Sequence, residues 1–299
     1  MGISATNARL LLDCRRAGVD FGRTLMLGRQ NVYLSAPEYD ALLASMGWKD
    51  GSAPTGAVSR SGEFAEPFFR ALGATTIDSM DASSFEGATL VHDLNTPVPR
   101  DWWERYDVVY DGGTLEHVFD YPRALTNALR LLKVGGRLIL HTPSNNMLGH
   151  GLYQFSPELF FRVLDPANGL RCVRILAVET GVAVRWYECI DPALAGVRGE
   201  MANRVPVWLH VEAEKTGPTP EVLRPVQQSD YQARWNAPGP DDAAVRSLAD
   251  PHHWVNPGLR RFLLGTFPGL TRRLERFVGI YLARGNSFRN RGAYRRWRG

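Results

Sequence analysis

The sequence is poor in several features that would each point to a particular class of protein. It contains 3 cysteines in 299 residues, and Cys14, Cys172 and Cys189 form no C-x-x-C pair. Because an odd number cannot close a complete set of disulfides, we expect a reducing, cytoplasmic environment. The same scatter argues against a thiolate zinc site, and we predict no metal site. No apolar run approaches the roughly 18 residues that span a bilayer, and the N-terminus lacks the apolar core of a secretory signal.

The overall charge is also small, but its distribution is uneven. The formal net charge is +4, from 35 basic and 31 acidic residues. Residues 258–299 contain eleven arginines, no lysine and one acidic residue, Glu275, so this segment carries +10 and residues 1–257 carry −6. A hydrophobic content of 44% and a charged content of 22% are ordinary for a globular chain and exclude collagen-like, coiled-coil and wholly disordered proteins.

Short apolar runs alternate with helical patterns along most of the chain. Seven runs read as strands, at residues 24–27, 75–80, 88–91, 106–110, 137–141, 170–178 and 205–211. Helical patterns or helix starts occur at residues 7–17, 35–38, 64–72, 122–132 and 156–158. This alternation predicts an α/β fold of Rossmann-like, doubly wound type, with a mainly parallel seven-stranded sheet covered by helices on both faces.

Composition further divides the chain into four expected parts. We expect an N-terminal helix in residues 1–20 and a main domain over 21–215. Residues 216–257 hold seven of the 19 prolines and are expected to be extended. Residues 258–299 are expected to form a basic helical extension, because apolar residues between Leu270 and Leu282 recur at helical spacing among arginines.

Polar residues or glycine follow the ends of five predicted strands: Gly28, Asp81, Asp93, Asp111 and His141. In an open α/β sheet, ligands bind at the carboxyl ends of the strands, near the point where strand order reverses. We therefore expect the functional site at this edge of the sheet.

The residues at this edge also carry a family resemblance. The segments YDVVYDGGTLEHV (106–118) and LLKVGGRLILHTPSNN (131–146), together with His92-Asp93-Leu94, resemble class I S-adenosylmethionine-dependent methyltransferases. The likeness covers roughly residues 20–215. It implies S-adenosylmethionine as the cofactor and methyl transfer as the reaction.

The resemblance assigns three residues to the methionine end of the cofactor. Gly28 would pass beneath the methionine portion, where a side chain would collide with it. Asp111 and Gly112 would line the methionine end near the sulfonium. The chain departs from the family here, because Leu27-Gly28-Arg29-Gln30-Asn31 has one glycine where members usually show G-x-G-x-G.

The adenosine end is assigned in the same way. Asp81 would accept hydrogen bonds from the two ribose hydroxyls, and Asp93 with the Leu94 backbone would face the adenine amino group. Asp78 is a rival for the ribose position, but the apolar strand pattern continues through Met80 and favours Asp81. Each of these carboxylates can alternatively be a local turn or helix cap.

Histidines are the candidate general bases for a hydroxyl or protonated amine acceptor, because imidazole titrates near neutrality. His117 is the first choice, His150 the second, and His141 a third candidate. A structural role for Glu116 and His117 in the loop after the fourth strand is the alternative. The loop from Asn145 to Phe155 is rich in polar and aromatic residues, which suits a small-molecule or sugar-like acceptor and O-methylation, or else a loop held by its own hydrogen bonds.

The arginine-rich segment leaves several partners open. It suits packing on the acidic body, an anionic membrane surface or a phosphate-bearing substrate, whereas no specific nucleic-acid motif is found. A nicotinamide-dependent oxidoreductase is disfavoured because G-x-G-x-x-G is absent after the first strand. The remaining alternative is a catalytically inactive methyltransferase-like scaffold that acts through its basic segment.

Overall fold

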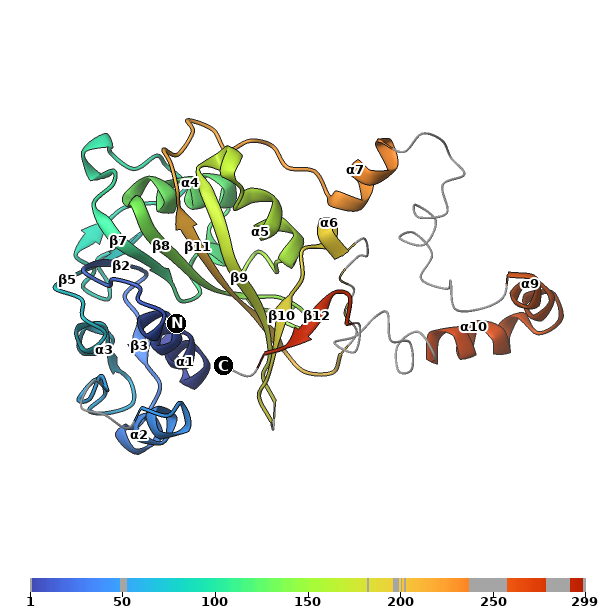
Figure 1. The fold of residues 1–299 in the computed structure, drawn as a ribbon, viewed down its shortest axis with the longest axis horizontal. Coiled ribbons are helices and arrows are strands. Elements are labelled where there is room, and N and C mark those ends of the chain that lie inside the picture. The colour runs from blue at the N-terminus through green and yellow to red at the C-terminus, as the bar shows by residue number, and fades with distance from the viewer. Residues whose placement is uncertain are drawn as a thin grey trace.

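The computed structural model describes residues 2–48, 53–181, 183–195, 199, 201, 203–236, 257–277 and 291–297. Its main feature is a twisted nine-stranded sheet with the strand order β12-β10-β9-β11-β8-β7-β2-β5-β6 (Figure 1). The sequence predicted an α/β fold with a mainly parallel sheet. The structure confirms the α/β fold and shows a mixed sheet, in which four neighbouring strand pairs are parallel and four are antiparallel. The seven predicted strands all form: β2 (Arg23–Leu27), β5 (Thr76–Asp81), β6 (Leu90–Val91), β7 (Tyr106–Asp111), β8 (Leu132–Pro143), β9 (Leu170–Glu179) and β11 (Val207–Lys215).

Two further strands extend this sheet at one edge. Strand β10 (Arg185–Cys189) pairs antiparallel with β9, and β12 (Tyr294–Arg296) pairs antiparallel with β10. The prediction of seven strands and a purely helical C-terminal segment missed both, because β10 is short and β12 lies in an arginine-rich stretch.

The chain reverses direction across the sheet between β2 and β7. From β2 it moves outward through β5 to β6, and then returns to the other side of β2 to form β7 and β8. These five strands run parallel, whereas β11 is antiparallel to both of its neighbours. The switch point therefore lies between β2 and β7, where a doubly wound sheet opens a crevice at the carboxyl ends of its strands.

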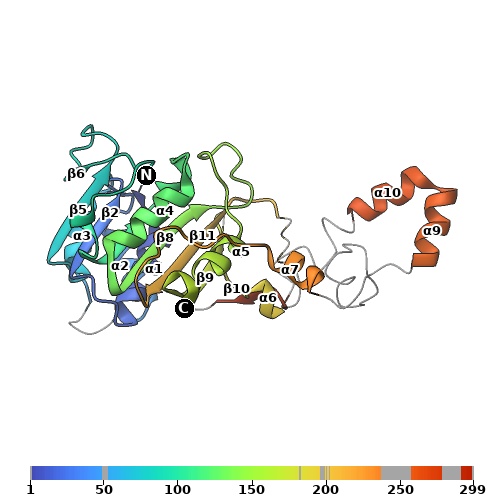
Figure 2. The same ribbon diagram turned by 90° about the horizontal axis from the view of Figure 1, so that it is seen from above.

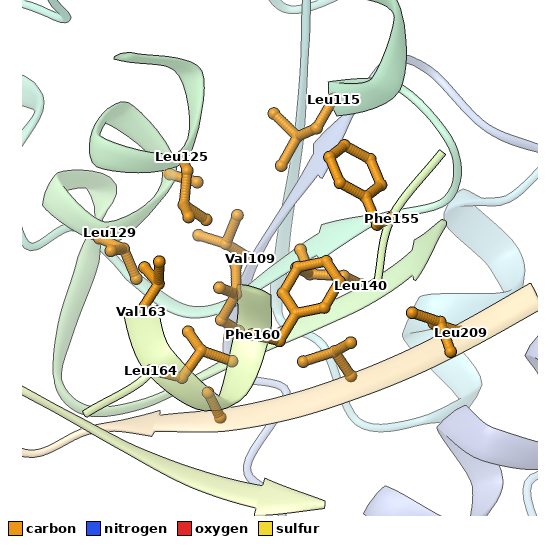
Figure 3. Close-up of a cluster of buried hydrophobic side chains, with 14 of the residues drawn as sticks. Val109, Leu115, Leu125, Leu129, Leu140, Phe155, Phe160, Val163, Leu164 and Leu209 are labelled. Atoms are coloured by element: carbon orange, nitrogen blue, oxygen red, sulfur yellow. The ribbon is translucent and has the colours of Figure 1, made fainter. Parts of the chain in front are cut away.

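Side chains from alternating strand positions build a core on each face of the sheet. One core receives Leu25 and Leu27 and is covered by α4 (Tyr121–Leu131) and α5 (Pro157–Val163). Figure 3 shows part of it, with Val109 and Leu140 of the sheet facing Leu129 and Phe160 of the two helices.

The other core receives Met26, the residue between those two leucines. It is covered by α1 (Ala5–Arg16), α2 (Ala36–Ser45) and α3 (Glu66–Ala71), which lie on the opposite side of the sheet from α4 and α5 (Figure 1). In the view from above, α4 lies in front of the sheet (Figure 2). The sheet is thus a middle layer covered by helices on both faces.

Local sequence explains where these helices begin. Ser35 and Glu38 form a capping box at the start of α2, and the Asp120 carboxylate accepts a hydrogen bond from the Arg123 backbone nitrogen at the start of α4. The first helix was expected to begin near Asn7, but it begins two residues earlier, at Ala5. The buried Asn7 amide does not cap the helix; it donates to the Tyr110 hydroxyl at 3.1 Å.

A small second sheet lies beside the N-terminus and was not expected from the sequence. Its strands β1 (Gly2–Ile3), β3 (Asn31–Val32) and β4 (Glu63–Phe64) each contain two residues. Three short 3₁₀ turns, η1 (Arg100–Trp102), η2 (Leu115–His117) and η3 (Pro166–Asn168), and the single helical turn α6 (Pro192–Ala195) complete the body.

The C-terminal third contains α7 (Ser229–Trp235), α9 (Pro257–Thr266) and α10 (Pro268–Phe277) before β12. The helix expected from Leu270 is found as far as Phe277. Its apolar positions Val278, Tyr281 and Leu282 lie outside the described residues, as do residues 237–256 of the proline-rich stretch. Within α9 and α10, Phe262, Leu270 and Leu274 are more than half exposed. Of the helices that the structure describes, none is long and apolar enough to cross a membrane.

Candidate functional site at the carboxyl ends of the strands

The turn after β2 forms the centre of the site. Gly28 has a φ of +68°, and its backbone nitrogen donates to the Met80 carbonyl of the neighbouring strand at 2.7 Å. A residue with a side chain would be strained in this conformation. The glycine therefore fixes the path of the chain at the switch point, where the resemblance places the methionine end of the cofactor.

The side chain of Gln30 occupies the space between this turn and the end of β7. Its Nε2 donates to the carbonyl oxygens of Leu27 at 2.8 Å and Gly28 at 3.3 Å, and the whole residue is buried. Its Oε1 is buried without a hydrogen-bond partner, and a Cβ added at Gly112 would lie 2.6 Å from it. Gln30 stands where the family pattern has its second glycine. The absence of that glycine was visible in the sequence and could have indicated that a side chain occupies this space.

Asp111 ends β7 and is fully buried. Its carboxylate accepts hydrogen bonds from the backbone nitrogens of Gly113 and Thr114, at 3.2 and 2.7 Å. Burial raises the pKa of Asp111, and the hydrogen bonds from the turn partly offset this effect. The carboxylate therefore shapes the turn that carries Gly112, while a direct contact of Asp111 with a cofactor stays a prediction.

Asp81 ends β5 and is partly accessible. Its Oδ1 accepts one hydrogen bond, from the Ser83 backbone nitrogen at 3.1 Å. Asp78 is engaged differently, because its Oδ2 accepts from the Tyr106 hydroxyl at 3.0 Å and lies 3.5 Å from Arg23 Nη2. Of the two aspartates, Asp81 has more hydrogen-bonding capacity left for a diol.

Asp93 follows β6 and is exposed. It accepts hydrogen bonds from the Asn95 backbone nitrogen at 2.9 Å and from the Asn95 side chain at 2.8 Å. These bonds lower the pKa of Asp93. The adjacent Leu94 is buried, and its carbonyl accepts from Asn127 Nδ2 at 3.0 Å. This turn is held in place, with an ionised carboxylate on its outer side.

His141 is unsuited to be a base that contacts an acceptor, although the sequence made it a third candidate. Its ring is buried, and its Nδ1 lies 3.0 Å from the Nδ1 of His210. It also stacks on Trp208 with ring centroids 4.5 Å apart. Burial lowers the pKa of His141 to about 3, with a smaller contribution from His150. The residue belongs to the packed interior of the sheet.

His117 and His150, by contrast, lie next to one another, although 32 positions separate them in the sequence. Their ring centroids are 5.4 Å apart, and His150 Nε2 lies 3.3 Å from Glu116 Oε1. His117 is exposed and His150 is about one-third exposed, whereas Glu116 is buried. Burial lowers the pKa of His150, and the neighbouring His117 adds to this effect. The two predicted base candidates therefore share one accessible place.

The loop that carries His150 borders a cavity of about 540 Å³. Residues that line it include Ser144, Asn145, Asn146, Gln154, Met201 and Tyr294. Both asparagines donate to the Asn203 Oδ1, at 2.7 and 2.6 Å, so the loop is also held by its own hydrogen bonds. The loop is thus compatible with both interpretations, since it is held by its own hydrogen bonds and also borders a cavity that an acceptor can enter.

Comparisons with known proteins concern the three-dimensional structure. No protein-family model matches the sequence, and no curated protein is significantly similar to it. Similar solved structures include a S-adenosylmethionine-dependent methyltransferase from Thermotoga maritima, with 16% identity, a TM-score of 0.34, and coverage of 71% of this chain and 89% of that one.

Two further solved structures give similar values. The 1,6-didemethyltoxoflavin-N1-methyltransferase of Burkholderia thailandensis, solved with 1,6-didemethyltoxoflavin and S-adenosylhomocysteine, is 15% identical, with a TM-score of 0.40 and coverage of 71% and 78%. A S-adenosylmethionine-dependent methyltransferase of Mesorhizobium loti is 14% identical, with a TM-score of 0.35 and coverage of 68% and 96%. At such values, what the site of this chain does must be judged from its own residues.

Proposed function

We propose that this chain is an enzyme that binds S-adenosylmethionine at the switch point between β2 and β7 and transfers its methyl group to a small-molecule acceptor. The observation that carries the proposal is the position of Asp81 and Asp93 at the carboxyl ends of adjacent strands, beside the Gly28 turn. The cofactor supplies a methyl group that is already activated on a sulfonium, so the protein mainly has to align the acceptor and exclude water.

The residues present fit the adenosine end of the cofactor as the structure stands. The Asp81 carboxylate is partly accessible and accepts one backbone hydrogen bond, so it can accept further ones from ribose hydroxyls. Asp93 and the Leu94 backbone would face the adenine. At the methionine end, Gln30 must rotate away from Leu27 and Gly28 before the cofactor can lie between Gly28 and Gly112.

The acceptor would enter from the side of the cavity beside the loop 145–155. Its asparagine, glutamine and serine lining suits hydroxyl groups, so a sugar-like acceptor and O-methylation follow as the finer proposal. His117 and His150 are the candidates to take the acceptor proton, because His150 belongs to the loop that borders this cavity and His117 lies next to it. Because its pKa is lowered, His150 is neutral at pH 7, as a general base must be.

Calorimetric titration of the full chain with S-adenosylhomocysteine tests the cofactor site. Asp81→Ala should weaken binding by roughly 1 to 3 kcal/mol, because it removes the hydrogen bonds to the ribose. Asp40→Ala, at an exposed position on α2, is the matched control and should bind like the wild type. If the folded wild-type chain does not bind at about millimolar ligand, the proposal is wrong.

One observation favours a second candidate function. Because Gln30 fills the methionine end, the domain could have lost its cofactor and act as a binding or scaffold protein through its arginines. Retained cofactor affinity together with acceptor turnover would exclude this candidate.

Deleting residues 258–299 would not test the scaffold function cleanly, because it also removes β12 from the sheet. Substitution of the exposed Arg261 and Arg273 by glutamate keeps β12 and lowers the formal charge of α9 and of α10 from +2 each to zero. Loss of association with anionic vesicles or phosphate-bearing ligands in this variant, with unchanged S-adenosylhomocysteine binding, would show that the two activities are separable.

A further inference from the structure

Glu116, His117 and His150 form a cluster whose side chains converge on one point. One ligand atom of each residue lies within 4.8 Å of the ligand atoms of the other two. Two of the residues belong to η2, directly after the switch-point turn, and the third comes from the loop after β8. Two strands that end side by side therefore deliver a carboxylate and two imidazoles to the same place.

The backbone around the cluster fixes this arrangement. The backbone nitrogens of Leu152 and Tyr153 donate to the Glu116 carbonyl at 2.8 and 3.2 Å. Gly151, with a φ of +70°, packs so closely that an added Cβ would lie 2.8 Å from the Glu116 Cγ. The loop is thus attached to η2 through the very residue that contributes the carboxylate.

The polar atoms at the centre of the cluster lack hydrogen-bond partners. Glu116 is completely buried, and neither of its carboxylate oxygens makes a hydrogen bond; the buried Nε2 of His150 makes none either. Burying such groups without partners is costly, and buried carboxylates are ordinarily paired or bound to a metal.

We propose that Glu116, His117 and His150 bind one divalent transition-metal ion, of the chemical class of Zn²⁺, Co²⁺ or Mn²⁺. Two imidazole nitrogens and one carboxylate are a donor set that first-row transition ions accept, whereas Mg²⁺ and Ca²⁺ prefer oxygen ligands alone. Three protein ligands leave further coordination positions open. Because His117 is exposed, we expect at least one of these positions to be accessible from solvent.

The role of such an ion rests on the proposed methyl transfer, but its binding does not. A hydroxyl group held by a divalent ion loses its proton more readily than a free one. With the ion bound, His117 and His150 would be ligands rather than bases, so water would take this proton. The acceptor oxygen would then gain the methyl group as the carbon–sulfur bond of the cofactor breaks. The site would therefore select acceptors whose hydroxyl can reach the ion, and would orient that oxygen at the edge of the sheet next to Gly112.

Metal titration of the untagged full chain, stripped with a chelator and studied without cofactor, tests the proposal. Calorimetry with Zn²⁺ should show one ion per chain with micromolar or tighter affinity, and Co²⁺ should give visible ligand-field absorption. Glu116→Gln, His117→Ala and His150→Ala should each weaken binding by about tenfold or more. His92→Ala, which changes a histidine outside the cluster, is the control, and circular dichroism verifies that each variant is folded.

Two results would overturn the metal site. One is a folded wild-type chain that takes up no Zn²⁺ or Co²⁺, as expected if Glu116 and His150 only share a proton. The other is unchanged binding in Glu116→Gln and His150→Ala, as expected if the three cysteines capture the ion. Because S-adenosylhomocysteine is titrated separately, a chain that binds the cofactor but no metal refutes this inference alone, and the converse result refutes the proposed function alone.

Discussion

Replacing Gln30 by alanine should strengthen cofactor binding while weakening the fold. In the structure, the Gln30 amide uses the Leu27 and Gly28 carbonyls as acceptors and lies against Gly112. A cofactor whose methionine end occupies this space has to displace both hydrogen bonds. At a net value of about 0.5 to 1.5 kcal/mol for each bond, the displacement costs roughly 1 to 3 kcal/mol.

Without the side chain this cost disappears, and the dissociation constant for S-adenosylhomocysteine should fall by about 5- to 150-fold. The same substitution should lower the free energy of unfolding by about 1 to 3 kcal/mol. The Leu27 carbonyl keeps one partner, because the Thr114 hydroxyl donates to it at 2.7 Å. The variant should therefore remain folded.

Calorimetry measures the affinity and thermal denaturation the stability of wild type, Gln30→Ala and the control Gln232→Ala, whose glutamine is exposed on α7. Equal or weaker cofactor binding by a folded Gln30→Ala chain would refute the reasoning. It would mean that Gln30 either helps to hold the cofactor or lies outside its path.

Other predictions concern the stability of the sheet. Burial alone would raise the pKa of Asp107, but hydrogen bonds from Lys133 Nζ and the Arg23 backbone nitrogen, both at 2.7 Å, lower it below 3.8. The ionised Asp107 therefore stabilises the folded state above pH 3.8, and this stabilisation is lost as the pH falls through the lowered pKa. Asp107→Asn should therefore cost about 1 kcal/mol at pH 7 in urea denaturation and progressively less in acid, and a pH-independent difference would contradict this ion pair. Phe160→Ala should cost about 3 to 5 kcal/mol, because the ring is completely buried between α5 and the sheet; a loss below 1 kcal/mol would show that this core repacks (Figure 3).

The sequence predicted the parts of the fold that depend on local pattern. The strands at β2, β7 and β8 are apolar runs bounded by glycine or aspartate, and α4 has its buried stripe at helical spacing, so both could be recognised without knowledge of their neighbours. Strand β12 could not, because Tyr294–Arg296 becomes a strand only by pairing with β10, about a hundred residues earlier.

The positions of the site residues could likewise be predicted from local pattern, but the contacts between their side chains could not. The residues at the strand ends were found because a parallel sheet brings them to one edge. The contact of Glu116 with His150 and the insertion of Gln30 beneath Gly112 depend on side-chain directions in two loops, and no periodic pattern encodes those.

The pairing of β12 with β10 changes what the arginine-rich segment is in topological terms. The Trp297 backbone nitrogen also donates to the Trp186 carbonyl at 3.1 Å, so the chain returns to the sheet after α9 and α10. Residues between Lys215 and Tyr294 are therefore an insertion between two strands of one sheet rather than a free tail. To remove the basic helices while keeping the sheet intact, α9 and α10 should be deleted internally and the ends joined by a linker. A simple truncation would also remove β12 and expose the edge of β10, and exposed strand edges favour aggregation.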